Sequence, residues 1–267
     1  MRHLAIASRV PARSWLTLTS TLVLIAGGAA FFVVGHRAAP LMFPSLSDVV
    51  GEFMTWESVR VLLVEARRTG LTVAVAFVLS VAWALPMGIA FGASMRLHRS
   101  TANTIDFLRS IPPSAVIPIA IMLIGTSRTM FVLLTGFAVG LILLVLTREA
   151  IRDIPPAKIA LFQESNWSRP TRLARLYVPS VLPDLRAHSQ IMVSLGLALV
   201  IVCEMLLSNG GIGAQIQHAR YALDLPVAYS FLIIAGVLGV LLNAFLRLTV
   251  TAIERSFYQP LRFDDEN

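Results

Sequence analysis

Charged residues are scarce in this chain of 267 residues. Asp, Glu, Lys and Arg make up only 14% of it, whereas a typical water-soluble domain carries roughly 25%. Hydrophobic residues account for 56%, and the mean hydropathy is +0.76. So few polar groups cannot cover the surface of a soluble globule of this length. The composition therefore predicts a membrane protein.

Cysteine and lysine each occur once. Cys203 lies inside an apolar run, so no intrachain disulfide can form. Lys158 follows Ala157 without a glycine run before it, whereas a phosphate-binding loop needs a Lys directly after its glycines. His188 and His218 lack partners at metal-ligand spacing, and neither His-Glu-x-x-His nor Gly-x-Ser-x-Gly occurs. We therefore expect no enzyme, metal site or bound cofactor, and an energy source in another subunit or an ion gradient.

Long apolar runs recur along the chain, most of them close to the ~20 residues that cross the hydrocarbon core of a bilayer. The runs are residues 15–35, 71–93, 111–124, 130–146, 191–207 and 228–250. They predict an all-α fold, a polytopic transmembrane bundle of about six helices. The first run exceeds the apolar core of a signal peptide, so we expect a retained helix. We divide the chain into an N-terminal anchor with an outer amphipathic segment (1–65), a transmembrane domain (66–258) and a cytoplasmic tail (259–267).

The basic residues predict the orientation, because cytoplasmic loops of membrane proteins are enriched in Lys and Arg. All 22 are arginines except Lys158. If the N-terminus is cytoplasmic, the inner segments hold most of them, and the opposite orientation inverts this bias. We therefore expect both termini inside, in a multi-pass protein of a bacterial cytoplasmic (inner) membrane. The net charge of +7 does not indicate nucleic acid, since basic and aromatic residues do not interleave in a soluble segment.

Three segments outside the apolar runs are informative. In the outer segment 38–66, Ser47 is a candidate N-cap for a short surface helix. The outer loop 208–227 contains the turn-rich sequence Asn-Gly-Gly-Ile-Gly at 209–213. The long inner loop 148–186 is basic and interrupted by prolines. Its pieces 157–164 and 171–177 are compatible with short helices.

The first piece of the inner loop carries an apolar ridge. Ile159 and Phe162 share a helix face by their i, i+3 spacing. Such a ridge in a basic loop has two natural locations, the lipid headgroup layer and a groove on a partner protein. The spacing alone leaves both open.

The same loop resembles the cytoplasmic loop of binding-protein-dependent ABC importer permeases, which have the type I fold. The resemblance rests on Arg-Asp-Ile-Pro at 152–155, on 157–162, and on Tyr-Val-Pro-Ser-Val-Leu-Pro at 177–183. Further motifs are typical of the sulfonate, taurine and nitrate branch and extend the resemblance over residues 42–258. They are Phe-Pro-Ser at 43–45 with Asp-Val-Val at 48–50, Phe-Leu-Arg-Ser-Ile-Pro-Pro at 107–113 with Ile-Pro at 117–118, and Val-Cys-Glu-Met-Leu at 202–206 with Gly-Ile-Gly at 211–213.

This resemblance implies a permease subunit that moves a small solute into the cytoplasm by alternating access. The implied solute is an organic or inorganic anion such as a sulfonate or nitrate. The implied partners are a dimer of ATPase subunits that bind ATP and Mg²⁺, a periplasmic or extracellular solute-binding protein, and a second permease copy or paralogue. The alternatives are a secondary transporter driven by an ion gradient and a membrane scaffold without transport activity.

The resemblance also assigns a coupling loop that contacts the ATPase. Its candidate residues are Ala157, Lys158, Ile159, Ala160, Leu161, Phe162, Asn166 and Pro179. Aligned on Pro179, Ala160 stands where the family has Glu, and Asn166 where it has Gly. Because the motif departs from the family at these positions, we expect a better-matched second permease or a co-adapted ATPase.

Candidate residues of the translocation pathway come from two places. One is the proline-rich start of the third run, with Ser110, Pro112, Pro113, Ser114 and Pro118. Prolines bend helices, and bent helices at membrane depth either line a cavity or are buried by protein. The kink could therefore serve a pore or packing alone.

The second place is Glu204, a carboxylate inside an apolar run. Such groups normally face a bundle interior or water. Glu204 could be a pathway or gate residue, or a structural carboxylate that binds the backbone of the loop 209–213. The glycine pairs Gly88/Gly92 and Gly136/Gly140 have the spacing that lets helices approach closely, and we expect them at helix contacts. For Ser194 and Asn243 we expect interhelical hydrogen bonds rather than solute contacts.

Overall fold

The computed structural model describes the backbone of residues 12–40, 42–164, 168–207 and 209–257, and within them the chain is helical without a strand. The predicted all-α class is confirmed. The elements in order are α1 (Ala12–Ala38), α2 (Leu46–Gly51), α3 (Trp56–Ala93), α4 (Met95–Ser110), the 3₁₀ turn η1 (Pro113–Val116), α5 (Ile117–Ile124), α6 (Arg128–Arg152), α7 (Pro156–Glu164), α8 (Arg169–Arg172), the π-helical turn η2 (Leu173–Tyr177), α9 (Val178–Leu207), α10 (Ile212–Ala222) and α11 (Leu225–Phe257).

Four of the described helices are long and apolar enough to cross a membrane. They are Glu57–Ala93, Arg128–Arg152, Pro170–Leu207 and Leu225–Phe257. A fifth span arises if α4 and the segment Pro113–Ile124, which meet at 81°, are counted together. Most of these spans are longer than the predicted apolar runs, because the helices continue into polar sequence beyond the hydrocarbon.

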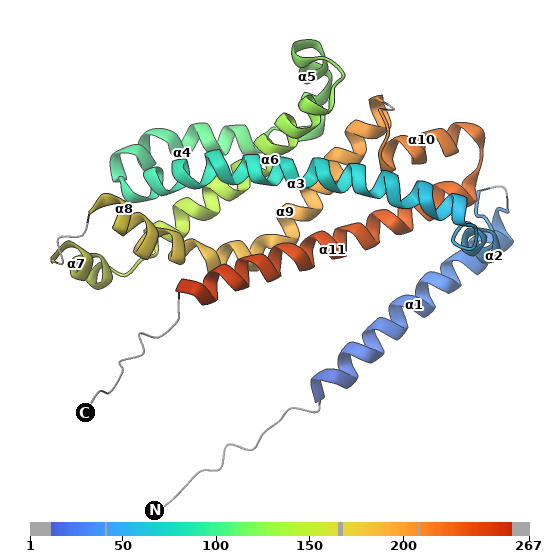
Figure 1. The fold of residues 1–267 in the computed structure, drawn as a ribbon, viewed down its shortest axis with the longest axis horizontal. Coiled ribbons are helices and arrows are strands. Elements are labelled where there is room, and N and C mark those ends of the chain that lie inside the picture. The colour runs from blue at the N-terminus through green and yellow to red at the C-terminus, as the bar shows by residue number, and fades with distance from the viewer. Residues whose placement is uncertain (1–11, 41, 165–167, 208, 258–267) are drawn as a thin grey trace, which may run out of the picture.

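The predicted third span, residues 111–124, is wrong as a single helix. Helix α4 ends at Ser110. After Pro112 one 3₁₀ turn follows, and then the short helix α5. Pro112 and Pro113 offer no backbone N–H and restrict the residues before them, so α4 cannot continue through them. Figure 1 shows α4 alongside α3 and α6, with α5 projecting from the bundle.

The long helices pack as a bundle, with α1 apart from it. In Figure 1 α1 runs at an angle to the other helices and meets them at its end near α2. There Phe32 of α1 stacks edge-on against Tyr229 of α11, with 5.2 Å between the ring centroids. Helix α2 begins one residue after Ser45, whose hydroxyl accepts from the Asp48 amide at 3.2 Å. The N-cap is therefore Ser45, and the predicted cap at Ser47 is wrong by two residues.

Helices α3 and α6 form the tightest contact, along two pairs of glycines. A Cβ on Gly88 would lie 2.6 Å from the Thr147 Cβ and 2.8 Å from the Leu144 carbonyl oxygen. One turn later, a Cβ on Gly92 would lie 2.7 Å from the Arg148 carbonyl oxygen. Gly136 and Gly140 of α6 receive Leu79 and Trp83 of α3 in the same way. The prediction that these glycines lie at helix contacts is confirmed.

We predict that Gly88→Ala destabilises the bundle, because the Leu144 carbonyl is backbone and cannot move aside without separating the two helices. Overpacking of this kind costs about 1–3 kcal/mol. Thermal unfolding of the protein purified in detergent measures the loss. The matched control is Gly236→Ala on α11, where nothing lies within 4 Å of the added Cβ. Equal unfolding midpoints for the two variants would contradict the close α3–α6 contact.

Candidate functional site

Glu204 is buried near the end of α9, with 1% of its surface exposed. The Thr69 hydroxyl of α3 lies 3.0 and 2.9 Å from the two carboxylate oxygens and donates to them. The Gly213 amide donates to Oε2 at 3.0 Å. The Thr69 oxygen in turn accepts from the Ile212 amide at 2.9 Å. One hydroxyl thereby links the carboxylate of α9 to the first turn of α10.

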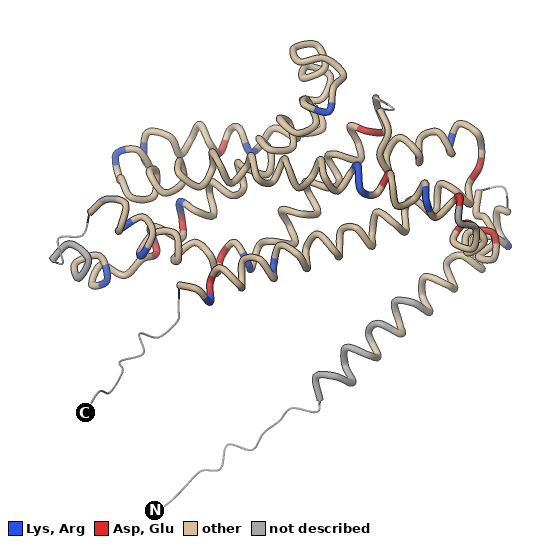
Figure 2. The backbone as a smooth tube through the Cα atoms, viewed as in Figure 1, with Lys and Arg blue, Asp and Glu red and all other residues tan. Residues whose placement is uncertain are grey.

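A second carboxylate holds the same turn from α3. The Gly211 amide donates to Oε2 of Glu65 at 2.5 Å, and Arg68 donates to Oε1 at 2.8 Å. We call this arrangement the turn clasp: the side chains of Glu65, Thr69 and Glu204 with the amides of residues 211–213. It joins α3, α9 and α10 at one end of the bundle. Figure 2 shows acidic and basic residues gathered beside the α9–α10 connection.

The clasp requires glycine in the turn. Gly210 and Gly211 have φ angles of 79° and 99°, which disfavour other residues. A Cβ on Gly211 would overlap the Glu204 carboxyl group, and one on Gly213 would lie 2.8 Å from the Glu204 Cβ. The Asn209 side chain donates to the Thr126 carbonyl and ties the turn to the chain before α6. The turn-rich sequence at 209–213 is therefore needed for close approach to a buried carboxylate.

This geometry supports the structural interpretation of Glu204, since its carboxylate binds the loop backbone. Sequence reasoning missed Glu65 and Thr69. Their i, i+4 spacing, which places both on one face of an apolar helix, was the available signal. Because Glu65 precedes the apolar run 71–93, composition suggested a residue in the outer segment.

The proline-rich segment packs against a different part of α9 from the clasp. Ile117 is buried against α6 and α9 in a cluster that includes Leu199 and Cys203, whereas Ser114 and Pro118 are exposed. The Ser110 hydroxyl donates to the Phe107 carbonyl at 2.7 Å. Glu204 faces α3 and α10 instead, so the candidate pathway residues do not form one cluster.

The candidate coupling helix α7 sits at the end of the bundle opposite the clasp (Figure 1). Ala157 and Ala160 are exposed, whereas Ile159 is half-buried against a cluster of Ile89, Ala150, Ile151, Ile154, Leu176 and Val181. Ile159 therefore packs against this cluster rather than standing free. Pro179 is buried in the first turn of α9. The side chains of Leu161 and Phe162, and all of Asn166, lie outside the described residues.

Polar residues between α9 and α11 are partly paired. Asn243 of α11 accepts from the Ser189 hydroxyl at 3.0 Å, which confirms the interhelical hydrogen bond expected for Asn243. Ser194 instead lines a groove of about 420 Å³ between α9 and α11, together with Gln190 and Asn243. Within the described residues, no group of three or more His, Cys, Asp or Glu could hold a metal ion.

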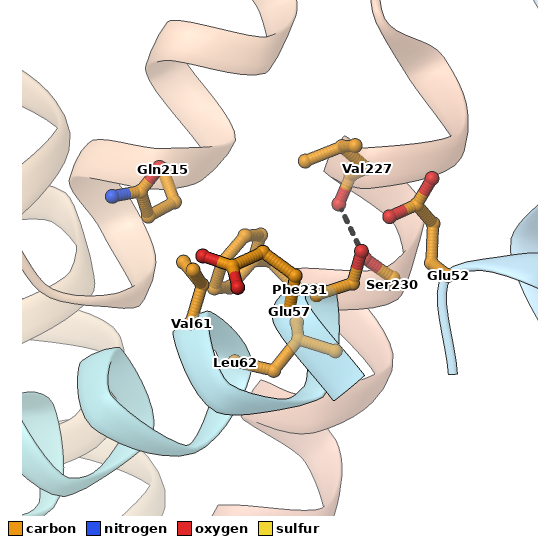
Figure 3. A pocket seen from close by; sticks show the side chains of 9 residues that line it. Glu52, Glu57, Val61, Leu62, Gln215, Val227, Ser230 and Phe231 are labelled. Carbon is orange, nitrogen blue, oxygen red and sulfur yellow. Dashed lines mark hydrogen bonds between the residues drawn. The ribbon is translucent and has the colours of Figure 1, made fainter. Parts of the chain in front are cut away.

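A smaller pocket of about 200 Å³ lies among α3, α10 and α11, beside the end of α2 (Figure 3). Val61, Leu62 and Phe231 supply apolar walls, and Glu52 and Glu57 supply carboxylates. Ser230 donates to the Val227 carbonyl at 2.7 Å, so its hydroxyl is already used. The pocket offers carboxylates over an apolar floor.

Residues 81–258 match the family described as binding-protein-dependent transport system inner membrane component. The chain belongs to this family. The match runs from the second half of α3 to the end of α11 and contains α7, Glu204 and the turn 209–213.

Several proteins are similar to this permease. A probable ABC transporter permease of Brucella melitensis is 30% identical over 64% of this chain and 70% of that protein. The taurine transport system permease protein of Escherichia coli is 23% identical over 63% and 61%. A putative aliphatic sulfonates transport permease protein of Bacillus subtilis is 27% identical over 66% and 63%. These relatives, with a nitrate import permease protein of Synechococcus elongatus that is 26% identical over 56% of this chain and 54% of that protein, confirm the sulfonate, taurine and nitrate branch.

Among solved structures, the MetNI methionine ABC transporter in inward-facing conformations matches with a TM-score of 0.64. The identity is 18%, over 75% of this chain and 99% of that one. This likeness establishes the type I permease fold.

We predict that Thr69→Val destabilises the permease, because it leaves the Ile212 amide without a partner and the Glu204 carboxylate with the Gly213 amide alone. An unpaired buried polar group costs about 1–3 kcal/mol. Thermal unfolding, together with hydrogen exchange at residues 211–213, checks the loss. Thr69→Ser keeps the hydroxyl and is the control. A Thr69→Val protein as stable as the Thr69→Ser protein would contradict the clasp.

Glu204→Gln tests the charge of Glu204 separately. A variant with intact assembly and transport would exclude a role for that charge.

Proposed function

We propose that this permease forms half of the transmembrane pathway of an ATP-driven importer and moves a small anion into the cytoplasm by alternating access. The family supports a permease of a binding-protein-dependent system. The observation that carries the proposal is the short helix α7, which is set between two membrane-spanning helices at the end opposite the clasp, with Ala157 and Ala160 open to a partner. ATP hydrolysis with Mg²⁺ takes place in partner ATPase subunits.

The proposed orientation puts α7 and both termini in the cytoplasm. The excess of arginines in the segments around α4, the α6 end and α7–α9 supports it. The clasp and the pocket of Figure 3 then face the outside, where a solute-binding protein docks.

The solute class rests on the relatives. Two of them are permeases named for taurine and for aliphatic sulfonates, which are organic sulfonates. A secondary transporter is disfavoured, because the ion pairs of the four described spans lie towards the ends of the bundle rather than in a chain across it, as a proton relay would require. Glu65 and Arg68 pair at the clasp, and Arg148 with Glu149 and Arg186 with Glu254 pair towards the other end.

A second permease completes the pathway in this proposal. The projecting α5 supports it, since Ile119, Met122 and Leu123 are 56%, 86% and 79% exposed beyond the bundle. The substituted coupling motif, with Ala160 in place of the family's Glu, supports a paralogous partner over a second copy.

The coupling proposal predicts a crosslink between α7 and the ATPase. Ala160→Cys, labelled with a thiol-reactive benzophenone and irradiated in membranes that contain the whole transporter, should join the permease to the ATPase subunit on a gel. The control is Leu223→Cys, which is 83% exposed at the opposite end of the bundle.

ATP-dependent uptake of labelled taurine or nitrate into proteoliposomes tests transport. Uptake that survives ATP removal but collapses with the proton gradient would contradict the proposal.

The paralogue prediction is tested with two differently tagged copies of the permease in one cell. Purification through the first tag should recover the ATPase and a different permease chain, but little of the second tag. Recovery of both tags in a complex that hydrolyses ATP in response to solute would show a homodimer and remove the need for a paralogue.

A further inference from the structure

Helix α4 reaches membrane depth although its sequence is polar. Its first residue lies beside the end of α6, where Arg152 donates to the Met95 sulfur at 3.7 Å. Ten residues later, Ile105 is buried among Ala84 of α3 and Leu143 and Leu144 of α6. A helix rises about 1.5 Å per residue, so these ten residues climb about 15 Å from that end. The second half of α4 therefore lies level with the apolar parts of α3 and α6.

One face of α4 holds it on the bundle. His98, Thr101, Ala102, Ile105 and Leu108 are buried or half-buried and recur every three or four residues. This spacing forms a single stripe against α3 and α6.

The opposite face of α4 is exposed and mostly polar. Its central stripe is Arg96, Ser100, Asn103, Phe107 and Ser110. On its flank, Asp106 and Arg109 approach to 4.0 Å with side chains 62% and 44% exposed. We call these residues the polar face of α4. It ends at Ser110, where the proline-rich break begins.

Lipid cannot cover this face. Charged and amide groups at membrane depth normally face water or protein, because hydrocarbon offers them no hydrogen bonds. Helix α11 provides the comparison within the same molecule. Its exposed residues Val240, Leu241, Phe245 and Leu248 are 60–70% exposed and apolar throughout, as contact with lipid requires.

We propose that the polar face of α4 lines the water-filled inner half of the solute route, from Ser110 at the proline break to Arg96 at the cytoplasmic end. The assignment rests on the proposed function for its orientation and solute. Arg96 and Arg99 are exposed without an ion-pair partner in the described structure, so the route's inner end attracts anions. Asn103 and Ser100 offer hydrogen bonds to a solute that leaves its binding site.

Thiol labelling tests this route, and the chain suits it because its single cysteine, Cys203, is fully buried. Ser100→Cys and Asn103→Cys are exposed to the membrane-impermeant anionic reagent MTSES in inside-out vesicles that contain the whole transporter. Asp153→Cys, in the exposed connection after α6, is the aqueous reference, and Val240→Cys on α11 is the lipid reference. We expect both α4 variants to react within about tenfold of the aqueous reference rate, and Val240→Cys at least a hundredfold more slowly.

Labelling at the slow rate of Val240→Cys at both α4 positions would overturn the proposal. Two positions keep the test decisive if one variant fails to reach the membrane.

In the Arg96→Gln/Arg99→Gln background, the reaction rate of MTSES relative to that of cationic MTSET should fall at least twofold. An unchanged ratio would remove the anion preference.

The labelling result is separable from the proposed function. It needs no ATP and no transported solute, so labelling without ATP-dependent uptake would keep the route and reject the energy source. Uptake without labelling would keep the importer and reject the route along α4.

Discussion

The buried carboxylate of Glu204 requires the structure around it to satisfy its hydrogen bonds. An ionisable group at the end of an apolar helix is costly unless donors surround it. The donors come from Thr69 of α3 and from the amide of Gly213, so the chain must bring three helices together at this point. Amides at the start of α10 have no partner within their own helix, and Thr69 and Glu204 bind those of Ile212 and Gly213. One arrangement thus satisfies a buried charge and a helix terminus together.

The glycine contacts and the proline break concern how the helices pack within the membrane. Lipid tails are as apolar as the side chains there, so no hydrophobic driving force brings the helices together. Small residues let α3 and α6 meet backbone to backbone, which replaces hydrophobic gain with close van der Waals contact. That rigid pair supports α4, whose packed stripe ends with Ile105 and Leu108 just before the prolines. The prolines then turn α5 away, which leaves the polar face of α4 uncovered.

The sequence predicted the long spans well, because apolar composition is a local property. The runs 71–93, 130–146, 191–207 and 228–250 all lie inside observed helices. Helix α4 was not predicted, since its arginines and hydroxyls resemble a loop until Ile105 is seen to pack on Leu143. The role of Glu204 also depended on contacts that sequence cannot supply. Thr69 lies 135 residues away, and no pattern of spacing links two positions so distant.

The two ends of the bundle differ in a way that bears on coupling. At one end the clasp joins α3, α9 and α10 through buried hydrogen bonds, which resist separation because each broken bond leaves an unpaired group. At the other end α7 is attached through Ile159 to an apolar cluster built from α3, α6 and α9, and apolar contacts are not directional. In the proposed coupling, a force on α7 acts on this cluster, while α3 and α9 stay joined to α10 at the clasp.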